Sequence, residues 1–284
     1  MTPADKLAAA GARALFALEA TRPEESVNLA RAALLVAAEE EPRRVDVARC
    51  LARLDELGEQ ARTRIVRAGG DAVGALNQFL FEEQGFAGNE ANYYDPRNSL
   101  LNHVLSTRRG IPITLSIVYM EVARRAGLGA EGVGLPGHFV VRAWAEGEGR
   151  PVLVDAFYGR TIGRDECQQR LDTLYEGRLR LTEEHLRAVG ARAILARVLG
   201  NLKAVYAQAQ LYRQALAAVE RILLVAPEDL GERRDRGMLL AQLGRLPEAI
   251  EEAQSYLALA PQAADAETVR EQLKKMRLKA ALLN

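Results

Sequence analysis

The hydrophobic positions in the first quarter of the chain follow a helical period. In "VDVARCLARLDEL" the apolar residues recur at helical spacing and form one broad stripe. The same spacing extends from about Asp5 to Arg67, with breaks expected near Pro23 and Pro42. We therefore predict a helical N-terminal region. The stripe consists of Val45, Val47, Cys50, Leu51, Leu54 and Leu57.

Helical patterns continue to about residue 127. The segment "DAVGALNQFLFEEQGF" is amphipathic and closes at Gly85, and a short helix is expected to begin near Asn98. Apolar residues then form one face between Pro112, which suits a first helical turn, and Gly127, which suits a helix end. This last segment predicts a buried helix.

The composition changes after that helix. Both "HFVVRAW" and "PVLVDAF" are rich in valine and aromatic residues, and the Gly-rich "AEGEGR" separates them. Short runs of this kind on either side of a glycine-rich loop are typical of a β-hairpin. We predict a small antiparallel sheet here.

From about Leu186 to its end the chain is helical again and repeats itself. "YRQALAAVERILLVAP" aligns with "LPEAIEEAQSYLALAP" at an offset of 34 residues, and Ala-Pro closes each unit. This period, with small residues where the helices cross, is typical of tetratricopeptide repeats. The alternative is two unrelated amphipathic helices that both end in Ala-Pro.

Composition narrows the classes of partner and ligand. Lys plus Arg and Asp plus Glu are both 38, so no net field favours nucleic acid or an anionic membrane. Two cysteines are too few for a disulfide framework, which predicts a reducing cytoplasm, and no apolar run is long enough to span a membrane. The three histidines are scattered, so we expect neither a metal nor a cofactor.

His138 is the first candidate for chemistry, because it follows a Pro-Gly turn and opens the first predicted strand. For a hairpin with an even-membered loop, Asp155 falls on the same face. Pairing Trp144 with Pro151 places Val140 opposite Asp155 and makes His138 its diagonal neighbour. An Asp beside a His can act as the base-and-orienter half of a catalytic triad. A structural His–Asp hydrogen bond, or two residues on opposite faces, are the alternatives.

Several long segments, in this order, resemble a known family: "FLFEEQGF", "NYYDPRNSLLNHVLSTRRGIPITLSIVYMEVARRAGL", "GVGLPGHFVVR" and "VLVDAFYGR". They resemble the transglutaminase-like superfamily, and within it the bacterial branch of the invasion-regulator-B type, in which tetratricopeptide repeats follow the core. The family's His and Asp fall on His138 and Asp155.

The resemblance implies an α+β fold, with a helical N-terminal region, a papain/transglutaminase-like core with a small antiparallel sheet, and an all-α repeat domain. We expect residues 1–186 to form the transglutaminase-like domain, with the α+β core at about 70–165. Residues 187–284 are expected to form the repeat domain.

The sequence departs from the family at the nucleophile. The resemblance implies a cysteine at the start of the helix after Gly110, near Pro112, and proline has no nucleophilic group. Cys50 and Cys167 lie in the wrong chain order. Two hydroxyls near the helix start, those of Thr114 and Ser116, are the remaining candidates, and a hydroxyl needs a well-placed base to act.

A second group of residues is expected to line a binding groove. "DPRNS" offers charged and amide side chains that bind a carboxylate or cap a helix, with capping favoured for Asn98. The aromatic pair just before it is more typical of hydrophobic anchors than of ligand contacts. The expected groove residues are Tyr94, Asp95, Arg97, Asn98 and Asn102.

Two hypotheses for function follow. The first, which the absent cysteine and the repeats favour, is a catalytically inactive core that binds a protein or peptide partner through its groove or its repeat face. The second is an amide-directed hydrolase or acyltransferase that uses His138 and Asp155 with Thr114 or Ser116 as its nucleophile. The complete His–Asp pair favours the second hypothesis.

Overall fold

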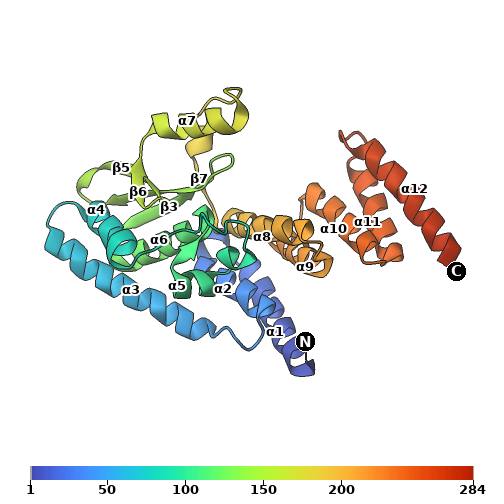
Figure 1. Ribbon diagram of the computed structural model, residues 1–284, viewed down its shortest axis with the longest axis horizontal. Coiled ribbons are helices and arrows are strands. Elements are labelled where there is room, and N and C mark those ends of the chain that lie inside the picture. The colour runs from blue at the N-terminus through green and yellow to red at the C-terminus, as the bar shows by residue number, and fades with distance from the viewer. Residues whose placement is uncertain (1, 284) are drawn as a thin grey trace. The chain divides into compact units, whose positions relative to one another are not determined.

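The computed structural model describes residues 2–283, and the chain divides into two compact units, 1–195 and 196–284 (Figure 1). The first unit extends past residue 186, the boundary expected from the sequence. The reason is strand β7 (Ala188–Val189), which pairs with β3 (Gly129–Val133) and so belongs to the sheet of the first unit.

The N-terminal region is helical, as predicted. It consists of α1 (Pro3–Ala20), α2 (Leu29–Glu40) and α3 (Val47–Ala68), and the breaks between them contain Pro23 and Pro42. Each helix begins where a polar side chain accepts a main-chain N–H three residues later, which satisfies one of the unpaired donors of the first turn. The capping residues are Thr2, Asn28 and Asp46.

The helices that lead to the sheet also follow the sequence pattern. α4 (Ala72–Asn77) continues as a π-helical turn (Gln78–Glu83) and stops before Gly85, whose φ is +73°. Short segments follow, namely β1 (Ala87–Gly88), a 3-10 helix (Pro96–Ser99), α5 (Leu101–Thr107) and β2 (Arg109–Gly110), which pairs in parallel with β1.

The predicted buried helix is α6 (Pro112–Ala126). Proline occupies its first turn, where a missing N–H costs nothing. Gly127 ends it with φ +90°, a left-handed conformation that glycine adopts without strain. Most of its side chains are buried, so this helix forms the centre of the unit.

The sheet is antiparallel throughout, in the order β6-β5-β4-β3-β7. The remaining strands are β4 (Val140–Ala145), β5 (Glu148–Asp155) and β6 (Arg160–Ile162). The predicted fold class, α+β with a small antiparallel sheet, is confirmed.

The β4–β5 hairpin differs from its predicted form at both ends. His138 and Phe139 precede β4, because the turn at Pro136 and Gly137 holds them outside the ladder. At the other end Ala145 pairs with Glu148, where a separate loop was expected. The strand bulges there, and glycines at 147 and 149 take positive φ values of +81° and +46°.

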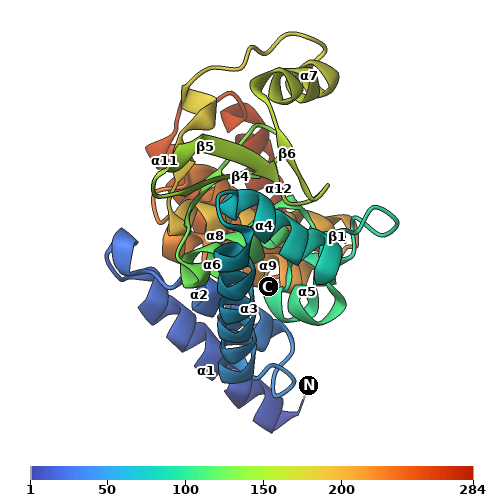
Figure 2. The ribbon, with the colours of Figure 1, turned by 90° about the vertical axis from the view of Figure 1, so that its left-hand side faces the viewer.

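Residues alternate between the two faces of the sheet, and helices cover both (Figures 1 and 2). α6 packs on one face, and α7 (Arg164–Tyr175) lies on the other, with the side chain of Cys167 in a small core. The fully buried or nearly buried members of that core are Val133, Leu135, Val140, Ile162, Cys167 and Leu186, with Leu153 packed against them.

Helix α8 (Ala191–Gln208) leads into the second unit, which contains α9 (Tyr212–Val225), α10 (Leu230–Gln242), α11 (Leu246–Leu259) and α12 (Ala266–Leu283). The start of α11 lies 34 residues after the start of α9, and the ends of the two helices are separated by the same 34 residues. Each is followed by an alanine, at 226 or 260, whose backbone is not helical, because the proline that comes next disfavours helical backbone.

Small residues allow helices of the second unit to approach closely. Ala249 and Ala253 on α11 are fully or almost fully buried, and a Cβ added to Gly237 on α10 would lie 3.1 Å from the Cβ of Glu252. This arrangement of paired helices is what the 34-residue period predicts.

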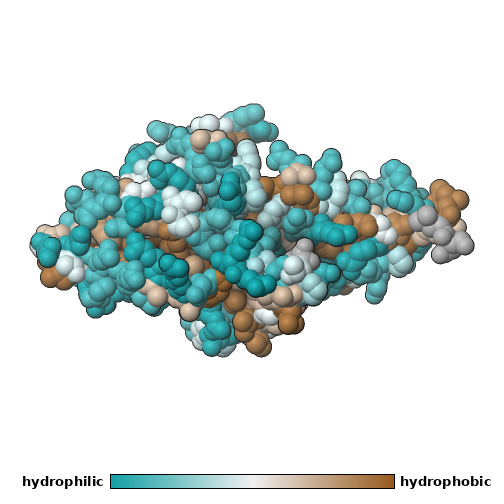
Figure 3. Space-filling view, turned by 60° about the horizontal axis from the view of Figure 1, so that its bottom comes forward, coloured by the Kyte–Doolittle hydropathy of each residue, from teal (hydrophilic) through white to brown (hydrophobic). Residues whose placement is uncertain are grey.

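The face of the molecule visible in Figure 3 is mainly hydrophilic, with small hydrophobic patches between the polar side chains. Among residues 2–283, no helix combines the length and the apolar character needed to cross a membrane.

Candidate functional site

The end of β5 and the turn before β4 hold the two residues predicted to form a pair. Asp155 is the last residue of β5 and has no exposed surface. His138 follows Gly137, whose φ of +72° turns the chain, and its main-chain N–H donates to the carbonyl of Leu135 at 3.1 Å. Val141 pairs with Val154, and this register continued by one residue places Val140 opposite Asp155, as in the pairing considered from the sequence.

The two side chains meet. Nε2 of His138 lies 2.9 Å from Oδ2 of Asp155, and the imidazole side chain is 10% exposed. The second carboxylate oxygen, Oδ1, accepts main-chain N–H bonds from Phe157 at 3.0 Å and Tyr158 at 3.3 Å. The carboxylate therefore has a position set by the turn after β5, while the catalytic role of the pair stays a prediction.

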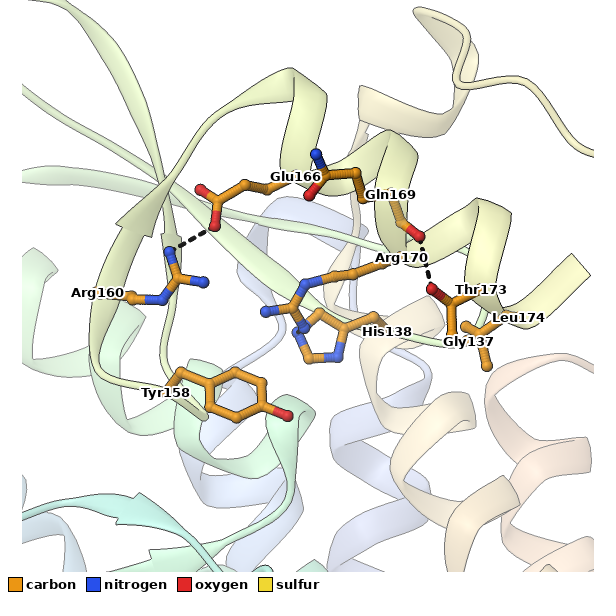
Figure 4. Close-up of a pocket in the computed structure, with 9 residues that line it drawn as sticks. All are labelled: Gly137, His138, Tyr158, Arg160, Glu166, Gln169, Arg170, Thr173 and Leu174. Carbon is orange, nitrogen blue, oxygen red and sulfur yellow. Dashed lines mark hydrogen bonds and ion pairs between the residues drawn. The ribbon is translucent and has the colours of Figure 1, made fainter. Parts of the chain in front are cut away.

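A third group that the sequence did not suggest joins the pair. Arg170, on α7, places Nη2 2.6 Å from Oδ2 of Asp155 and Nη1 3.0 Å from Nε2 of His138. Its guanidinium group lies over the ring of Tyr158, 4.9 Å from the ring centre (Figure 4). We call His138, Asp155 and Arg170 the ionic cluster.

Asp155 carries the negative charge of this cluster. Burial by itself would raise the pKa of Asp155, but the hydrogen bond from His138 and the positive charges of His138 and Arg170 outweigh it and hold that pKa below its usual value. The carboxylate therefore stays ionised at neutral pH. An ionised buried carboxylate needs such partners, since removing it from water without them is costly.

The hydroxyls predicted as substitute nucleophiles are part of the helix start. Thr114 is 1% exposed, and its Oγ1 donates to the carbonyl of Asn98 at 2.7 Å and accepts the N–H of Ile111 at 3.2 Å. Ser116 is fully buried, and its Oγ donates to the carbonyl of Pro112 at 2.8 Å. Both hydroxyls thus satisfy main-chain groups at the first turns of α6.

The two cysteines lie in helices. Cys50 is half-buried on α3, and burial together with the charge of Asp46 raises the pKa of its thiol. Cys167 is fully buried on α7, and burial raises the pKa of its thiol as well. A raised thiol pKa lowers the fraction of thiolate, the nucleophilic form.

The predicted groove residues separate into different environments. Asp95, Arg97 and Asn98 help line a hollow of about 220 Å³ that is distinct from the one beside His138. Tyr94 is 70% exposed, and Asn102 turns to α2, where its Nδ2 donates to Glu41 at 3.1 Å.

The capping role expected for Asn98 is wrong. Asp95 caps the 3-10 helix, because its carboxylate accepts the N–H of Arg97 at 2.9 Å and pairs with its guanidinium at 2.6 Å. Asn98 lies inside that helix, 4% exposed, and its Nδ2 donates to the carbonyls of Asn92 and Tyr93. A buried amide that reaches two carbonyls of a preceding loop holds that loop in place.

A hollow of about 400 Å³ opens beside the ionic cluster (Figure 4). Its walls come from the turn at Gly137 and His138, from Tyr158 in the turn between β5 and β6, from the start of β6, and from one face of α7. The side chains on that face are Glu166, Gln169, Arg170, Thr173 and Leu174. Within residues 2–283, no three His, Cys, Asp or Glu side chains are grouped so that they could share a metal ion.

Helix α7 is the element that the sequence interpretation missed, and it supplies much of this hollow. Its signal was present: Cys167, Leu171 and Leu174 recur at helical spacing between Gly163 and Gly177. Glu166 also accepts the N–H of the residue before the helix, as a capping residue does. The segment is short and mostly polar, so its apolar stripe is weak.

Comparison with known proteins agrees with this architecture. Residues 48–200 match the family described as the transglutaminase-like superfamily, and residues 202–274 match the tetratricopeptide repeat. A UPF0162 protein of Xylella fastidiosa is 37% identical over 201 residues, which cover 70% of this chain and 71% of that protein. A UPF0162 protein of Pseudomonas aeruginosa is 31% identical over 223 residues, 78% of this chain and 80% of that protein.

A eukaryotic protein is similar to this chain over a shorter stretch. Mouse F-box only protein 21 is 31% identical over 153 residues, which cover 51% of this chain and 23% of the mouse protein. The resemblance inferred from the sequence is thereby confirmed. Because the matched core covers more than half of the chain, and a UPF0162 protein is 37% identical over 70% of it, the chain belongs to the transglutaminase-like superfamily and, within it, to the UPF0162 proteins.

Proposed function

We propose that this protein is a binding module in which a transglutaminase-like core without a working nucleophile is joined to repeats that hold a protein or peptide partner. Tetratricopeptide repeats generally mediate contacts between proteins, and their stacked helices form extended binding surfaces. Regulation through binding, in the cytoplasm, is the role we expect for such a module.

The start of α6 is the observation that carries this proposal. The family's nucleophile falls near Pro112, which has no reactive group, and the neighbouring hydroxyls of Thr114 and Ser116 bond to main-chain carbonyls. A hydroxyl becomes a useful nucleophile only when a base accepts its proton. Hydroxyls that donate to carbonyls inside the helix start are poorly placed for that.

Arg170 supports the same conclusion. In a catalytic triad the carboxylate orients one tautomer of the imidazole and stabilises the imidazolium that forms. Here Arg170 and His138 share the same oxygen of Asp155, at 2.6 Å and 2.9 Å. Part of the negative charge that would assist His138 already neutralises a permanent cation.

An amide-directed hydrolase or acyltransferase is the second candidate, and the retained contact between His138 and Asp155 favours it. It would require Thr114 or Ser116 to leave its main-chain partner and approach the imidazole. The two candidates therefore differ in whether any turnover depends on His138.

Turnover provides the first test. Release of ammonia from a glutamine-containing peptide, and its transfer to hydroxylamine, should be at background level for the wild type, and equal for His138→Ala and for His185→Ala. His185 is the matched control, because it is a histidine that does not line the hollow. A rate that His138→Ala and Thr114→Val abolish while His185→Ala retains it would establish the enzyme.

Capture of partners from a bacterial lysate provides the second test. Arg213, exposed on α9, helps line a hollow of about 400 Å³ within the repeat unit. Partners retained by wild type and His138→Ala but lost by Arg213→Glu would place binding on the repeats. Loss by His138→Ala alone would place it on the core. No specific partner in any experiment, together with His138-dependent turnover, would overturn the proposal.

A further inference from the structure

The hollow beside the ionic cluster has the size of a ligand site. Its volume of about 400 Å³ is in the range of small-molecule and side-chain pockets. Figure 4 shows the side chains of Arg160 and Tyr158 facing those of α7 across the opening, with the imidazole of His138 between them. The binding module proposed above leaves the chemistry of such a ligand open.

Arg170 gives this hollow a cationic wall. Its side chain is 24% exposed, whereas the carboxylate of Asp155 that balances it has no exposed surface. A group that enters the hollow therefore meets the guanidinium and not the carboxylate. A guanidinium carries five N–H donors, and the two contacts of Arg170 to the cluster leave others for a ligand.

A second guanidinium stands at the rim. Arg160, on β6, pairs through Nη1 with Glu166 at 2.6 Å, and its side chain is 52% exposed. The remaining donors of its planar fork can reach an anion at low cost, since an exposed ion pair is weak and rearranges easily. The ring of Tyr158 lies beneath the guanidinium of Arg170 and limits its movement.

The rest of the wall favours a singly charged organic anion. Glu166 also lines the hollow, and its negative charge would repel a dianion such as phosphate more strongly than a monoanion. Leu174 and the ring of Tyr158 offer apolar surface beside the charges. A carboxylate on a short carbon chain matches both features, because a guanidinium fork fits a carboxylate in a bidentate manner.

We propose that this hollow binds a carboxylate group of a partner peptide, carried by an acidic side chain or by the chain's C-terminus, with Arg170 and Arg160 as its anchors. The inference rests on the proposed binding function and names the chemistry of its partner. The imidazole side chain of His138, which is 10% exposed, forms part of the wall of the same hollow.

Small probes separate the two sources of carboxylate. N-acetylglutamic acid α-amide carries only a side-chain carboxylate, N-acetylglutamine carries only a terminal one, and N-acetylglutamine amide is the neutral control. Inorganic phosphate tests for a general anion site. The full-length protein is titrated with each, and the ¹H–¹⁵N signals of the arginine Nε groups and of the main chain at Gly137 and His138 are followed.

One or both carboxylates should shift these signals with a Kd of about 1 mM, and the neutral amide should not. Arg160→Gln should weaken binding about tenfold, as expected for the loss of a charge-assisted hydrogen bond. Arg187→Gln is the matched control, because Arg187 also pairs with a glutamate on the surface and does not line the hollow. Arg170→Lys keeps the charge, loses the fork and should weaken binding further.

The outcomes decide each claim separately. Binding of one carboxylate alone identifies the source, and equal binding of both supports a carboxylate site in general. Equal binding of the neutral amide, tighter binding of phosphate, no shift with any probe, or equal affinity of Arg160→Gln and the wild type would each overturn the inference. If Arg170→Lys fails to fold, Arg160→Gln still decides. None of these results tests the proposed binding function, which fails if no specific partner is captured and His138-dependent turnover is found.

Discussion

Replacing Asp155 by asparagine should destabilise the first unit by about 2–4 kcal/mol at pH 7. Asparagine keeps the size of the side chain and can still accept the main-chain N–H bonds of Phe157 and Tyr158 through its carbonyl oxygen. What it removes is the negative charge shared by His138 and Arg170. The amide NH₂ that takes the place of Oδ2 cannot accept from Arg170, so the experiment removes both the charge and its acceptor while the size of the side chain is kept.

The magnitude follows from burial. Breaking a fully buried ion pair by removing one partner costs about 3–5 kcal/mol, because the other charge is left uncompensated. The side chain of Arg170 is 24% exposed, so water can solvate part of the charge left without a partner. The upper limit of the expected destabilisation is therefore below about 5 kcal/mol. A hydrogen bond to a charged group is worth about 1.5–3 kcal/mol, which sets the lower end.

Unfolding in urea measures this change. Trp144, the single tryptophan, lies on β4, so its fluorescence reports the first unit and not the repeats. Arg160→Gln is the control. It breaks the exposed ion pair between Arg160 and Glu166, which at 2.6 Å is as short as the pair between Arg170 and Asp155, and it should leave the urea midpoint unchanged. Equal stabilities of wild type and Asp155→Asn would refute the reasoning, since the cluster would then contribute no net free energy.

The difference between wild type and Asp155→Asn should also depend on pH. The pKa of Asp155 in the folded protein lies below its ordinary value of 3.8, so folding favours the ionised form. Stability from this group is fully present above pH 3.8 and is lost as the pH falls through the lowered folded pKa. We expect a constant difference from pH 7 to about 5, which shrinks only in more acidic solution. A difference that stays constant down to pH 2 would contradict this linkage.

Three further changes test other parts of the structure. Thr114→Val should lower the free energy of unfolding by about 1–3 kcal/mol, because it leaves a buried main-chain N–H unpaired, and an unchanged urea midpoint would contradict a structural role for this hydroxyl. Iodoacetamide should alkylate Cys50 before Cys167, because the buried thiol of Cys167 reacts only when the protein unfolds. Peptide mapping by mass spectrometry measures the two rates. Equal rates in the native protein would contradict the burial of Cys167. Gly11→Ala should raise the thermal midpoint of unfolding, because open space surrounds this helical glycine. Gly127→Ala should lower that midpoint, because φ at this position is +90°. Equal shifts of the midpoint for the two variants would contradict both expectations.

Local patterns predicted most of the helical structure. The breaks at Pro23 and Pro42, the start of α6 at Pro112 and its end at Gly127 depend on main-chain chemistry that acts within one or two turns. The 34-residue period of the repeats is likewise visible in the sequence, because each unit buries the same positions against its neighbours.

Local patterns predicted only part of the contact between His138 and Asp155. Alternation along a strand places both on one face for an even register, but it does not select that register. The ladder is irregular between Glu148 and Val152 on β5, and no pattern of apolar residues predicted this irregularity.

By itself, the sequence determined which segments are helical or extended, that a second unit repeats, and that the cysteine expected at the start of α6 is replaced by proline. Tertiary structure alone decided which side chains meet. Asn98 became a support for a loop, and Thr114 and Ser116 became part of a helix start. Arg170 reached the His–Asp pair because α7 packs across the face of the sheet where Asp155 points. The physical reason is that secondary structure follows from neighbours in the chain, whereas an ionic cluster depends on how distant elements pack.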